Sequence, residues 1–474
     1  MPLPHTKIVA TLGPASTAPE MIARLVAAGV SVFRLNFSHG TQEQKLTYIN
    51  AIRAVATRPV AILADLCGPK IRLGHLELDA MLVSPGDTVT FQREPLVGHD
   101  NIVSSNYPRL IDDLQIGQRV LIDDGAIRMI VTEKHPDLVR CQVTHGGIIQ
   151  SNKGINLPNT QVNQPSITEK DFSDAAFAIE HQLDYLALSF VRSADDVKML
   201  RDFVAKSGGT QHIISKIEKP QAVEAIESII EASDAVLVAR GDLGVEMDLT
   251  TVPLIQKHIV HAAHDAGKPV IVATQMLQSM VDNPTPTRAE VSDVANAILD
   301  GADAVMLSGE TAVGKYPVGA VHTLTEIAEK TEIYRHIHHL IPPPPKLLQR
   351  VHHRTAAIAH GARDVVDDIN ARILFVWSQA GGSARYLSKY RLDVRIVALS
   401  NDPAAVRRMA LYHGVTPLLA EIPPHFDDLP VFIDRIAAEH KLASPGDRVV
   451  ICAGAPLGII GVTNSLSVHT LGKV

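Results

Sequence analysis

Short apolar runs, rich in β-branched residues and apolar on both faces, recur along the first 310 positions of the chain. Eight of them are found, at residues 7–12, 30–35, 60–65, 184–190, 212–217, 234–239, 269–274 and 303–307. Runs that do not alternate with polar residues are typical of buried parallel strands. Amphipathic helical stretches separate them, for example at residues 19–28, 42–56, 195–206, 220–232, 252–266, 288–297 and 317–332.

The spacing of these runs predicts the fold class, which is α/β. Successive runs are separated by the length of a single βα unit, except for the third and the fourth. An insertion of residues 71–164 accounts for this longer spacing. Eight βα units in sequence predict a (β/α)8 TIM barrel with one domain inserted after its third strand. An open, doubly wound sheet is the weaker alternative, because eight regular units favour closure.

The insertion has a different pattern. Its short runs alternate between apolar and polar positions at residues 87–91, 119–122, 127–133 and 139–144. Turn signals such as Asp123-Asp124-Gly125 separate the runs, and no apolar pattern of helix length interrupts them. The insertion is therefore expected to be a small β-barrel module.

A third unit begins after four consecutive prolines at residues 342–345, which cannot continue a helix and form a stiff spacer. Strands are expected there at residues 371–377, 395–400, 448–452 and 466–471, with helices at 354–366, 384–390, 404–413 and 431–440. This pattern predicts a separate α/β domain. The predicted boundaries are 1–70 and 165–343 for the barrel, 71–164 for the insertion and 344–474 for the C-terminal domain.

Composition excludes several classes of protein. The 474 residues carry 44 Lys and Arg against 51 Asp and Glu, a net charge of −7, which gives no basic patch for nucleic acid or an anionic membrane. No apolar run reaches the roughly 18 residues of a membrane span, and the first residues lack the pattern of a signal peptide. Three separate cysteines (Cys67, Cys141 and Cys452) suit a reducing compartment. We therefore expect a cytoplasmic enzyme.

Polar side chains follow seven of the eight predicted strands, at the end of the barrel where functional groups of this fold gather. They are Arg34, Asn36, Ser38 and His39, then Asp65, Lys70 and Arg72, then Ser189 and Arg192, then Lys216 and Glu218, then Arg240, Gly241 and Asp242, then Thr274 and Gln275, and finally Ser308 and Glu310. One such residue could be a helix cap or part of a structural ion pair. Seven polar ends on one rim are harder to explain in that way.

The residue types on this rim favour phosphoryl transfer. Multiple cations suit a multiply charged phosphate substrate, and the rim offers Arg34, Lys70, Arg72 and Lys216. Glu218 and Asp242, on adjacent strands, suit an oxygen-ligated Mg²⁺. A helix opening at Arg240 would present free N–H groups to a carboxylate. Positioning, cations and Mg²⁺ are most of what phosphoryl transfer needs.

Two other motifs are set aside. Residues 309–315 have the spacing of a phosphate-binding loop, but Tyr316 replaces the Ser or Thr that would bind Mg²⁺. Five histidines crowd the proline linker, and their spacing fits no defined zinc pattern, so a solvated surface is the favoured interpretation. They are His336, His338, His339, His352 and His353.

Nine segments, collinear with the family order, resemble pyruvate kinase. They are TKIVATLGP (6–14), RLNFSHG (34–40), GPKIR (68–72), IDDG (122–125), KGINLP (153–158), SKIEKP (215–220), VARGDLGVE (238–246), ATQML (273–277) and LSGETAVGKYP (307–317). The late segment APLGIIGVTN (455–464) also resembles the family. The resemblance implies phosphate transfer from phosphoenolpyruvate to ADP, giving pyruvate and ATP in the last step of glycolysis. It further implies a mobile β lid, a homotetramer and allosteric regulation through the C-terminal domain.

The resemblance also implies roles for residues around phosphoenolpyruvate. Arg34 would grip the transferring phosphate, and Lys216 would offset the charge on it. Glu218 and Asp242 would hold Mg²⁺ or Mn²⁺. The substrate carboxylate would be received by the N–H groups of Gly241 and Asp242. Thr274 would line the enolpyruvate site, and a proton relay to the product is expected from Ser308 and Glu310.

Nucleotide contacts and a monovalent-cation site are implied in the same way. The nucleotide contacts would be Asn36, Phe37, Ser38, His39, Arg72 and Lys153, with Asp124 also working from the lid. The K⁺ ligands would be Asn36, Ser38, Asp65 and the carbonyl of Leu66. Lys70 stands where many relatives carry Glu, so we expect its ammonium to replace K⁺ and the enzyme to need no added K⁺. The alternative is that Lys70 points to solvent and K⁺ is still required.

The loop at residues 378–383 and the residue Cys67 each have two interpretations. The loop at Ser378, Gly381, Gly382 and Ser383 joins a predicted strand to a predicted helix, so it could bind a phosphorylated effector or be a plain turn. Cys67 could be oxidisable because Lys70 and Arg72 are nearby, or it could be an inert small residue.

Two other functions compete with the kinase. A metal-dependent pyruvate aldolase would explain Glu218 and Asp242, but it would not explain the insertion or the C-terminal domain. A non-catalytic metabolite sensor predicts losses among Lys216, Glu218, Asp242 and Thr274, and all four are present.

Overall fold

Eight parallel strands close into a barrel in the computed structural model, which describes residues 3–158, 160–340, 342–351 and 353–473. The strands are β1 (Lys7–Thr11), β2 (Val30–Asn36), β3 (Ala61–Asp65), β12 (Tyr185–Leu188), β13 (His212–Ile217), β14 (Ala235–Ala239), β15 (Val270–Ala273) and β16 (Ala304–Leu307). Their order around the barrel is β1-β16-β15-β14-β13-β12-β3-β2. The predicted TIM barrel is confirmed, and the open sheet is wrong.

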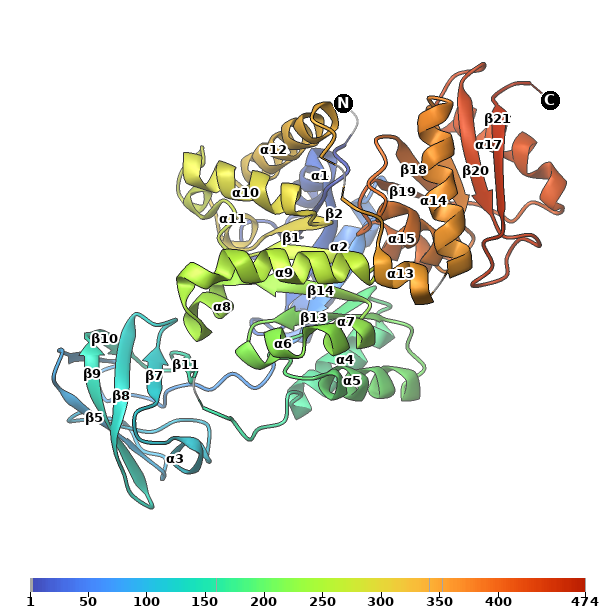
Figure 1. Cartoon of the computed structure of the whole chain (residues 1–474). Helices are drawn as coiled ribbons and strands as arrows, with labels where there is room; N and C mark the ends of the chain where they lie inside the picture. Colours follow the sequence, from blue (N-terminus) through green and yellow to red (C-terminus); the bar gives the residue numbers. More distant parts are fainter. Residues whose placement is uncertain (1–2, 159, 341, 352, 474) are drawn as a thin grey trace.

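Helices form a ring around this barrel (Figure 1). The ring contains α1 (Pro19–Ala28), α2 (Gln42–Val55), α4 (Glu169–Glu180), α5 (Ala194–Lys206), α7 (Ile226–Ala232), α9 (Val252–Asp265), α10 (Arg288–Asp300) and α12 (Pro317–Ile337). The single helix predicted at 220–232 is two helices, because Ala225 leaves helical geometry (φ −97°, ψ 18°) between α6 (Pro220–Glu224) and α7. Two short helices, α8 (Arg240–Glu246) and α11 (Gly309–Ala312), lie at the ends of strands β14 and β16.

The insertion is all-β, apart from one helical turn, α3 (Leu110–Asp113). A six-stranded sheet in the order β11-β7-β8-β9-β5-β6 contains β5 (Thr88–Gln92), β6 (Ile102–Val103), β7 (Arg119–Ile122), β8 (Ile127–Lys134), β9 (Leu138–His145) and β11 (Ile155–Asn156). A second sheet pairs β4 (Ala80–Val83) with β10 (Gly147–Gln150). Apolar side chains from both sheets form one core that is separate from the barrel core.

The C-terminal region is a five-stranded sheet in the order β19-β18-β17-β20-β21. Its strands are β17 (Ile373–Trp377), β18 (Arg395–Ser400), β19 (Val415–Leu419), β20 (Arg448–Ala453) and the antiparallel β21 (Ser465–Thr470). Its helices are α13 (Lys346–Val351), α14 (His353–Asp368), α15 (Gly382–Ser388), α16 (Pro403–Met409) and α17 (Leu429–Glu439). Strand β19 was not predicted, because Pro417 interrupts its pattern, and β19 accordingly lies at the edge of the sheet.

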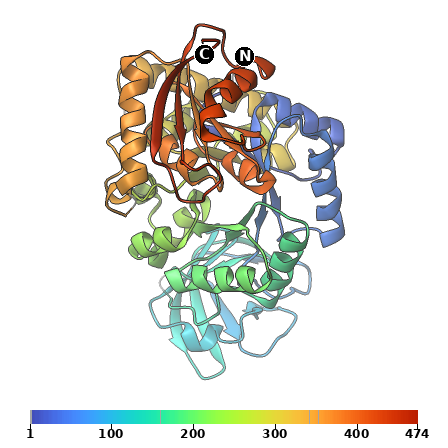
Figure 2. The same ribbon diagram turned by 90° about the vertical axis from the view of Figure 1, so that its right-hand side faces the viewer.

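The insertion and the C-terminal region lie at opposite ends of the barrel (Figures 1 and 2). At the end where the barrel strands begin, two aspartates bind cations of the C-terminal region. Asp303 accepts a hydrogen bond from Lys389 at 2.6 Å, and both side chains are 0% exposed. Asp184 accepts one from Arg407 at 2.7 Å. The insertion lies at the other end of the barrel. The domain boundaries given above (1–70 and 165–343, 71–164, and 344–474) stay predictions.

Within the described part of the chain, no helix is both long enough and apolar enough to cross a membrane.

Replacing Lys389 with Met should destabilise the attachment of the C-terminal region. Burial would raise the pKa of Asp303, but Lys389 and Arg391 outweigh it and lower that pKa, so the carboxylate is charged and depends on its partners. Removing one partner of a buried ion pair typically costs about 3–5 kcal/mol. Urea unfolding should be followed by the fluorescence of Trp377, the one tryptophan of the chain, which lies in β17. Lys330→Met, at an exposed position, is the control, and equal midpoints for the two variants would contradict the prediction.

Candidate active site

The predicted cations and carboxylates of the rim form one hydrogen-bonded cluster. Arg34, at the end of β2, binds Asp65 through Nε at 2.7 Å and Nη2 at 2.5 Å. Lys216, on β13, lies between two carboxylates, with Nζ 3.2 Å from Asp65 Oδ1 and 2.8 Å from Glu218 Oε1. It also donates to the hydroxyl of Ser189 at 2.8 Å. The sequence placed these residues on one rim, and the structure brings them together.

Burial and charge act against each other in this cluster. Burial alone would lower the pKa of Lys216, but the carboxylates of Asp65 and Glu218 outweigh it and raise that pKa well above its usual range. Burial would raise the pKa of Asp65, but Lys216 and Arg34 lower it. The pKa of Glu218 is raised by burial, with Lys216 opposing the shift and Asp242 adding to it. Lys216 is therefore held as a cation, and the Glu218 carboxylate is the member that most lacks positive charge.

Glu218 and Asp242 have the chemistry of a divalent-cation site. Both offer carboxylate oxygens, and their mutual repulsion contributes to the raised pKa of Glu218, which a bound cation would relieve. Glu218 Oε2 accepts the N–H of Phe190 at 2.8 Å, which fixes the side chain. No group of three or more His, Cys, Asp or Glu side chains suited to a metal occurs among the residues that the structure describes. The fit therefore rests on two carboxylates.

Thr274 contacts the helix that carries Asp242. Its backbone has φ +72°, which is rare for a β-branched residue, and its Oγ1 accepts the N–H of Gly241 at 2.7 Å and donates to Ala273 O at 2.6 Å. Arg240 donates to the carbonyl of Thr274 at 2.8 Å and binds Asp293 at 2.7 Å. The strained residue is thus held in place by α8, and the Gly241 N–H already has an acceptor.

Ser308 and Glu310 lie together after β16, but Glu310 is occupied. Its Oε2 accepts the N–H of Ser308 at 2.8 Å and its Oε1 accepts the N–H of Leu277 at 3.1 Å, and the residue is 1% exposed. Glu310 therefore links the loops after β15 and β16, and it holds Ser308 in position.

The predicted nucleotide contacts are divided between the barrel and the insertion. Lys153 pairs with Asp123 at 3.0 Å, and Arg72 donates to the carbonyl of Asn152 at 3.0 Å, so both are held within the insertion. Asp124 is exposed and lines a groove together with Val245 of α8. The remaining contacts, Asn36, Phe37, Ser38 and His39, lie in the turn after β2.

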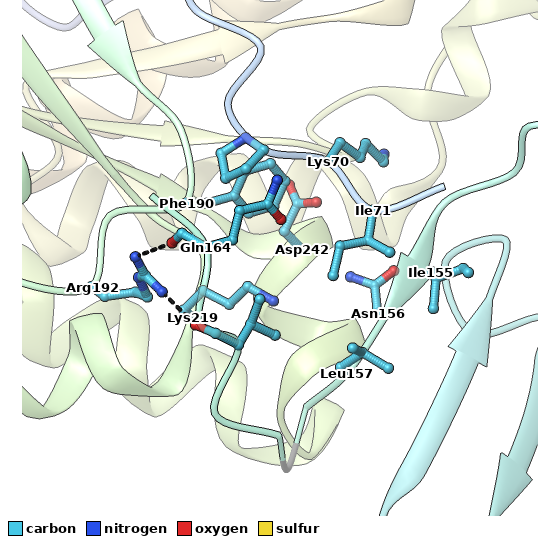
Figure 3. A pocket seen from close by; sticks show the side chains of 12 residues that line it. Lys70, Ile71, Ile155, Asn156, Leu157, Gln164, Phe190, Arg192, Lys219 and Asp242 are labelled. Atoms are coloured by element: carbon cyan, nitrogen blue, oxygen red, sulfur yellow. Dashed lines mark hydrogen bonds between the residues drawn. The ribbon is translucent and has the colours of Figure 1, made fainter. Parts of the chain in front are cut away.

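The predicted monovalent-cation ligands already have protein partners. Asn36 Oδ1 accepts the N–H of Ser38 at 3.0 Å, and the carbonyl of Leu66 accepts the hydroxyl of Ser189 at 2.7 Å. Asp65 is in the ion pairs described above. Lys70 is half-buried and lines a cavity of about 60 Å³ between the insertion and the barrel, together with Asp242 and Lys219 (Figure 3).

Two residues that fix the connections of the insertion were not predicted in that role. Asp171 of α4 accepts the N–H of Gly68 at 3.0 Å and the N–H of Thr168 at 2.8 Å, so it holds both connections. Arg192, predicted only as a rim residue, binds the carbonyls of Val162 at 2.8 Å and Gln164 at 2.7 Å, which Figure 3 shows. The spacing of Thr168 and Asp171 matches a helix capping box, and this was the available signal.

The structure also places the loop at residues 309–315, some of the histidines near the proline linker and the three cysteines. Residues 309–312 form the single turn α11, and His336 binds Asp393 at 2.7 Å. His352 and the side chain of His353 lie outside the described part of the chain. Burial raises the pKa of Cys141 and of Cys452 to about 12, whereas Cys67 is half-buried.

The predicted effector loop follows β17. Ser378 Oγ accepts the N–H of Ala384 at 3.1 Å, Gly381 has φ +87°, and Ser383 is hydrogen-bonded to Thr463. Helix α15 begins at Gly382, where a Cβ would meet no atom within 4 Å.

Comparison with other proteins gives consistent matches over nearly the whole chain. Residues 3–321 match the family model described as pyruvate kinase, barrel domain, and residues 356–469 match pyruvate kinase, alpha/beta domain. A pyruvate kinase of Corynebacterium efficiens is 41% identical over 472 residues, covering 99% of this chain and 98% of the relative. One of Mycobacterium tuberculosis is 41% identical over 470 residues, with 98% of each covered. Pyruvate kinase 2 of Synechocystis is 40% identical over 483 residues, with 100% of this chain and 80% of the relative covered.

Thr274→Val should uncouple α8 from the loop after β15, while Thr274→Ser should not. Val keeps the shape of Thr but leaves the partly buried Gly241 N–H without its acceptor. An unpaired buried donor costs about 1–3 kcal/mol, and the partial burial places the expected loss at the lower end of that range. Ser retains the hydroxyl and is the matched control. Thermal unfolding should separate the two variants, with Val lower and Ser near wild type. Equal melting temperatures for Val and Ser would show that the hydroxyl is not what holds this contact.

Proposed function

The chain belongs to the pyruvate kinase family and is a phosphotransferase, and from that premise we propose that it transfers the phosphoryl group of phosphoenolpyruvate to ADP, giving pyruvate and ATP. The observation that supports this most directly is the buried cluster of Arg34 and Lys216 with Asp65 and Glu218. It presents two fixed cations at the rim of the barrel. Phosphoryl transfer depends chiefly on such positioning and on stabilisation of charge.

Arg34 and Lys216 are proposed to bind the phosphoryl group during transfer. Asp65 binds both cations, and together with Glu218 it keeps Lys216 charged, so neither cation has to reorganise as charge moves. Ser189 donates to Leu66 O and accepts from Lys216, which orients the ammonium further. Arg34 Nε and Nη2 both contact Asp65 Oδ2, and Arg34 can exchange part of this bonding for bonds to two oxygens of a phosphate.

Glu218 and Asp242 are proposed to hold Mg²⁺ or Mn²⁺. When bound, the divalent ion would neutralise charge on the oxygens of the substrates. The protein contributes the orientation of both carboxylates, through the Phe190 N–H for Glu218 and through α8 for Asp242.

The substrate carboxylate is proposed to lie at the start of α8. Because the Gly241 N–H is bonded to Thr274, the N–H of Asp242 is the better candidate to receive it. Thr274 then acts on this site through Gly241. For the proton that completes pyruvate, the hydroxyl of Ser308 remains a candidate donor, and Glu310 acts as its positioning residue, because both Glu310 oxygens accept backbone N–H groups.

Residues 71–164 are proposed to act as a lid, with 1–70 and 165–343 as the barrel domain and 344–474 as the regulatory domain. Arg72, Lys153 and Asp124 would contact the nucleotide from the lid, and the turn at residues 36–39 would contact it from the barrel. Closure would exclude water, which could otherwise accept the phosphoryl group.

Regulation and assembly are proposed from the family resemblance. A phosphorylated effector would bind the loop at residues 378–383, where Gly381 has a positive φ and Gly382 leaves open space. The enzyme would be a homotetramer that acts in the cytoplasm, at the last step of glycolysis.

Lys216→Met tests both the reaction and the role of the ammonium. Wild type should form pyruvate from phosphoenolpyruvate and ADP with Mg²⁺, measured by coupled oxidation of NADH. The variant should lose about 10²–10³ in kcat, with a smaller change in KM, because the ammonium acts mainly on charge in the transition state. Lys198→Met, at an exposed position on α5, is the control. A wild type that forms no pyruvate would refute the proposed reaction, and a variant within tenfold of wild-type kcat would refute the role.

Lys70→Glu tests the requirement for K⁺. The ammonium of Lys70 lies on the cavity that Asp242 also lines, and its side chain packs against Gly154 of the lid, where a Cβ would lie 2.9 Å from Lys70 Cε. A tethered cation has an effective concentration that a dissolved ion does not match. Wild type should therefore keep most of its rate in a tetramethylammonium buffer free of K⁺ and NH₄⁺.

The Glu variant changes the local charge by two units, and its rate should rise when K⁺ is added. Lys70→Met removes the cation without adding an anion, and it separates these two contributions. Strong activation of the wild type by K⁺ would contradict the prediction.

A further inference from the structure

Glu246, the last residue of α8, connects three parts of the molecule. Its Oε1 accepts a hydrogen bond from Asn156 Nδ2 of β11 at 2.9 Å. The same oxygen accepts one from Lys219 Nζ at 2.5 Å. Glu246 is 3% exposed and Asn156 is 8% exposed. Figure 3 shows Asn156 and Lys219 at the cavity that Asp242 also lines.

Two of these parts carry the proposed metal ligands. Lys219 directly follows Glu218 in the chain, and α8 carries Asp242 in its first turn and Glu246 at its end. A helix of seven residues is about 10 Å long and behaves as one short rod. The pair between Lys219 and Glu246 therefore fixes the segment of Glu218 relative to the segment of Asp242.

The third part is the lid. Asn156 is the last residue of β11, which pairs with β7 in the six-stranded sheet. A displacement of this sheet moves Asn156 away from Glu246. Asn156 thus links the lid to the segment of Asp242, and its hydrogen bond ends on the oxygen that also receives Lys219.

The junction has spare acceptors. Glu246 Oε2 and Asn156 Oδ1 are buried and have no hydrogen-bond partner among the described residues. A polar network whose members are only partly satisfied is less stable than a complete one. Such a contact is suited to forming and breaking as the lid moves, rather than to holding the fold.

We propose that Glu246 is a positioning residue that couples the position of the lid to the spacing of Glu218 and Asp242. The inference rests on the proposed function, because it uses the metal role of these two carboxylates. When Asn156 engages Glu246, the two carboxylates are held at the spacing that binds the divalent ion. When the lid moves away, Glu246 Oε1 loses one of the two donors that bind it, and Lys219 is the donor that stays.

The test inverts the polarity of the contact. Asn156→Asp keeps the size of the side chain, but it sets a carboxylate against Glu246. The loss of a hydrogen bond to a charged group corresponds to a roughly 10- to 100-fold change in an equilibrium constant. We expect a decrease of that size both in Mn²⁺ affinity, measured by electron paramagnetic resonance of the enzyme without substrates, and in kcat/KM for ADP.

The double variant Asn156→Asp/Glu246→Gln supplies the rescue. The amide of the new Gln can donate to the carboxylate of the new Asp, and Lys219 can pair with the same carboxylate. Mn²⁺ affinity and kcat/KM should therefore return to within about threefold of wild type. Asn101→Asp makes the same chemical change in the turn before β6 and is the matched control. If Asn156→Asp does not fold, Asn156→Ser replaces it, because its side chain is too short to reach Glu246.

Two results would overturn the inference. One is a single variant within about threefold of wild type in both measurements, and the other is a double variant no better than the single one. If the wild type makes no pyruvate, the proposed function fails, and the Mn²⁺ measurements still decide whether Glu246 couples the lid to the two carboxylates.

Discussion

The compensation of buried charge is the constraint on which the reactive end of this molecule depends. Parallel strands of a closed barrel bring their ends to one rim, so charged residues that follow the strands must share a small, partly dry space. Lys216 shows the result, because burial acts to neutralise it and Asp65 with Glu218 keep it charged. Arg34 supplies the remaining positive charge to Asp65. The cations at this rim are therefore already fixed by carboxylates of the protein.

The same constraint governs the opposite end of the barrel with a different outcome. Asp184 and Asp303 stand at the starts of β12 and β16, and each binds a cation from the C-terminal region. In each pair both charges come from the protein. Asp303 and Lys389 are fully buried, and Asp184 is fully buried while Arg407 is 19% exposed. At the rim, Glu218 keeps a raised pKa, which leaves room for further positive charge. One end of the barrel thus attaches the C-terminal region, and the other carries the cluster of cations and carboxylates.

Most of the fold and the central cluster could be predicted, because both follow from local patterns. The eight strands are runs that the chain repeats. The order of the barrel puts Arg34 and Asp65 on the neighbouring strands β2 and β3, and it puts Lys216 on β13, with only β12 between β13 and β3. What sequence did not reveal depends on contacts between distant segments. The bond of Thr274 to Gly241, and that of Asp171 to Gly68, each join segments more than 30 residues apart. Thr274 carries no local signal of its role, and the capping box of Asp171 marks the start of α4 but not the bond to Gly68. Strand β19 lacked a signal because Pro417 breaks its pattern.

The way the insertion is attached limits how it can move. Asp171 binds the backbone of both connections, and Arg192 binds the carbonyls of the returning one, so the roots of the insertion are held by the barrel itself. The body of the insertion has its own apolar core and is therefore a unit that moves as a whole. With fixed roots and a rigid body, the freedom that remains lies in the short segments between them. Lys70 lies in one of these segments, and its side chain is next to Gly154, which directly precedes β11 in the body of the insertion. A change of charge at position 70 therefore falls where the insertion meets the barrel, at the cavity that Asp242 also lines.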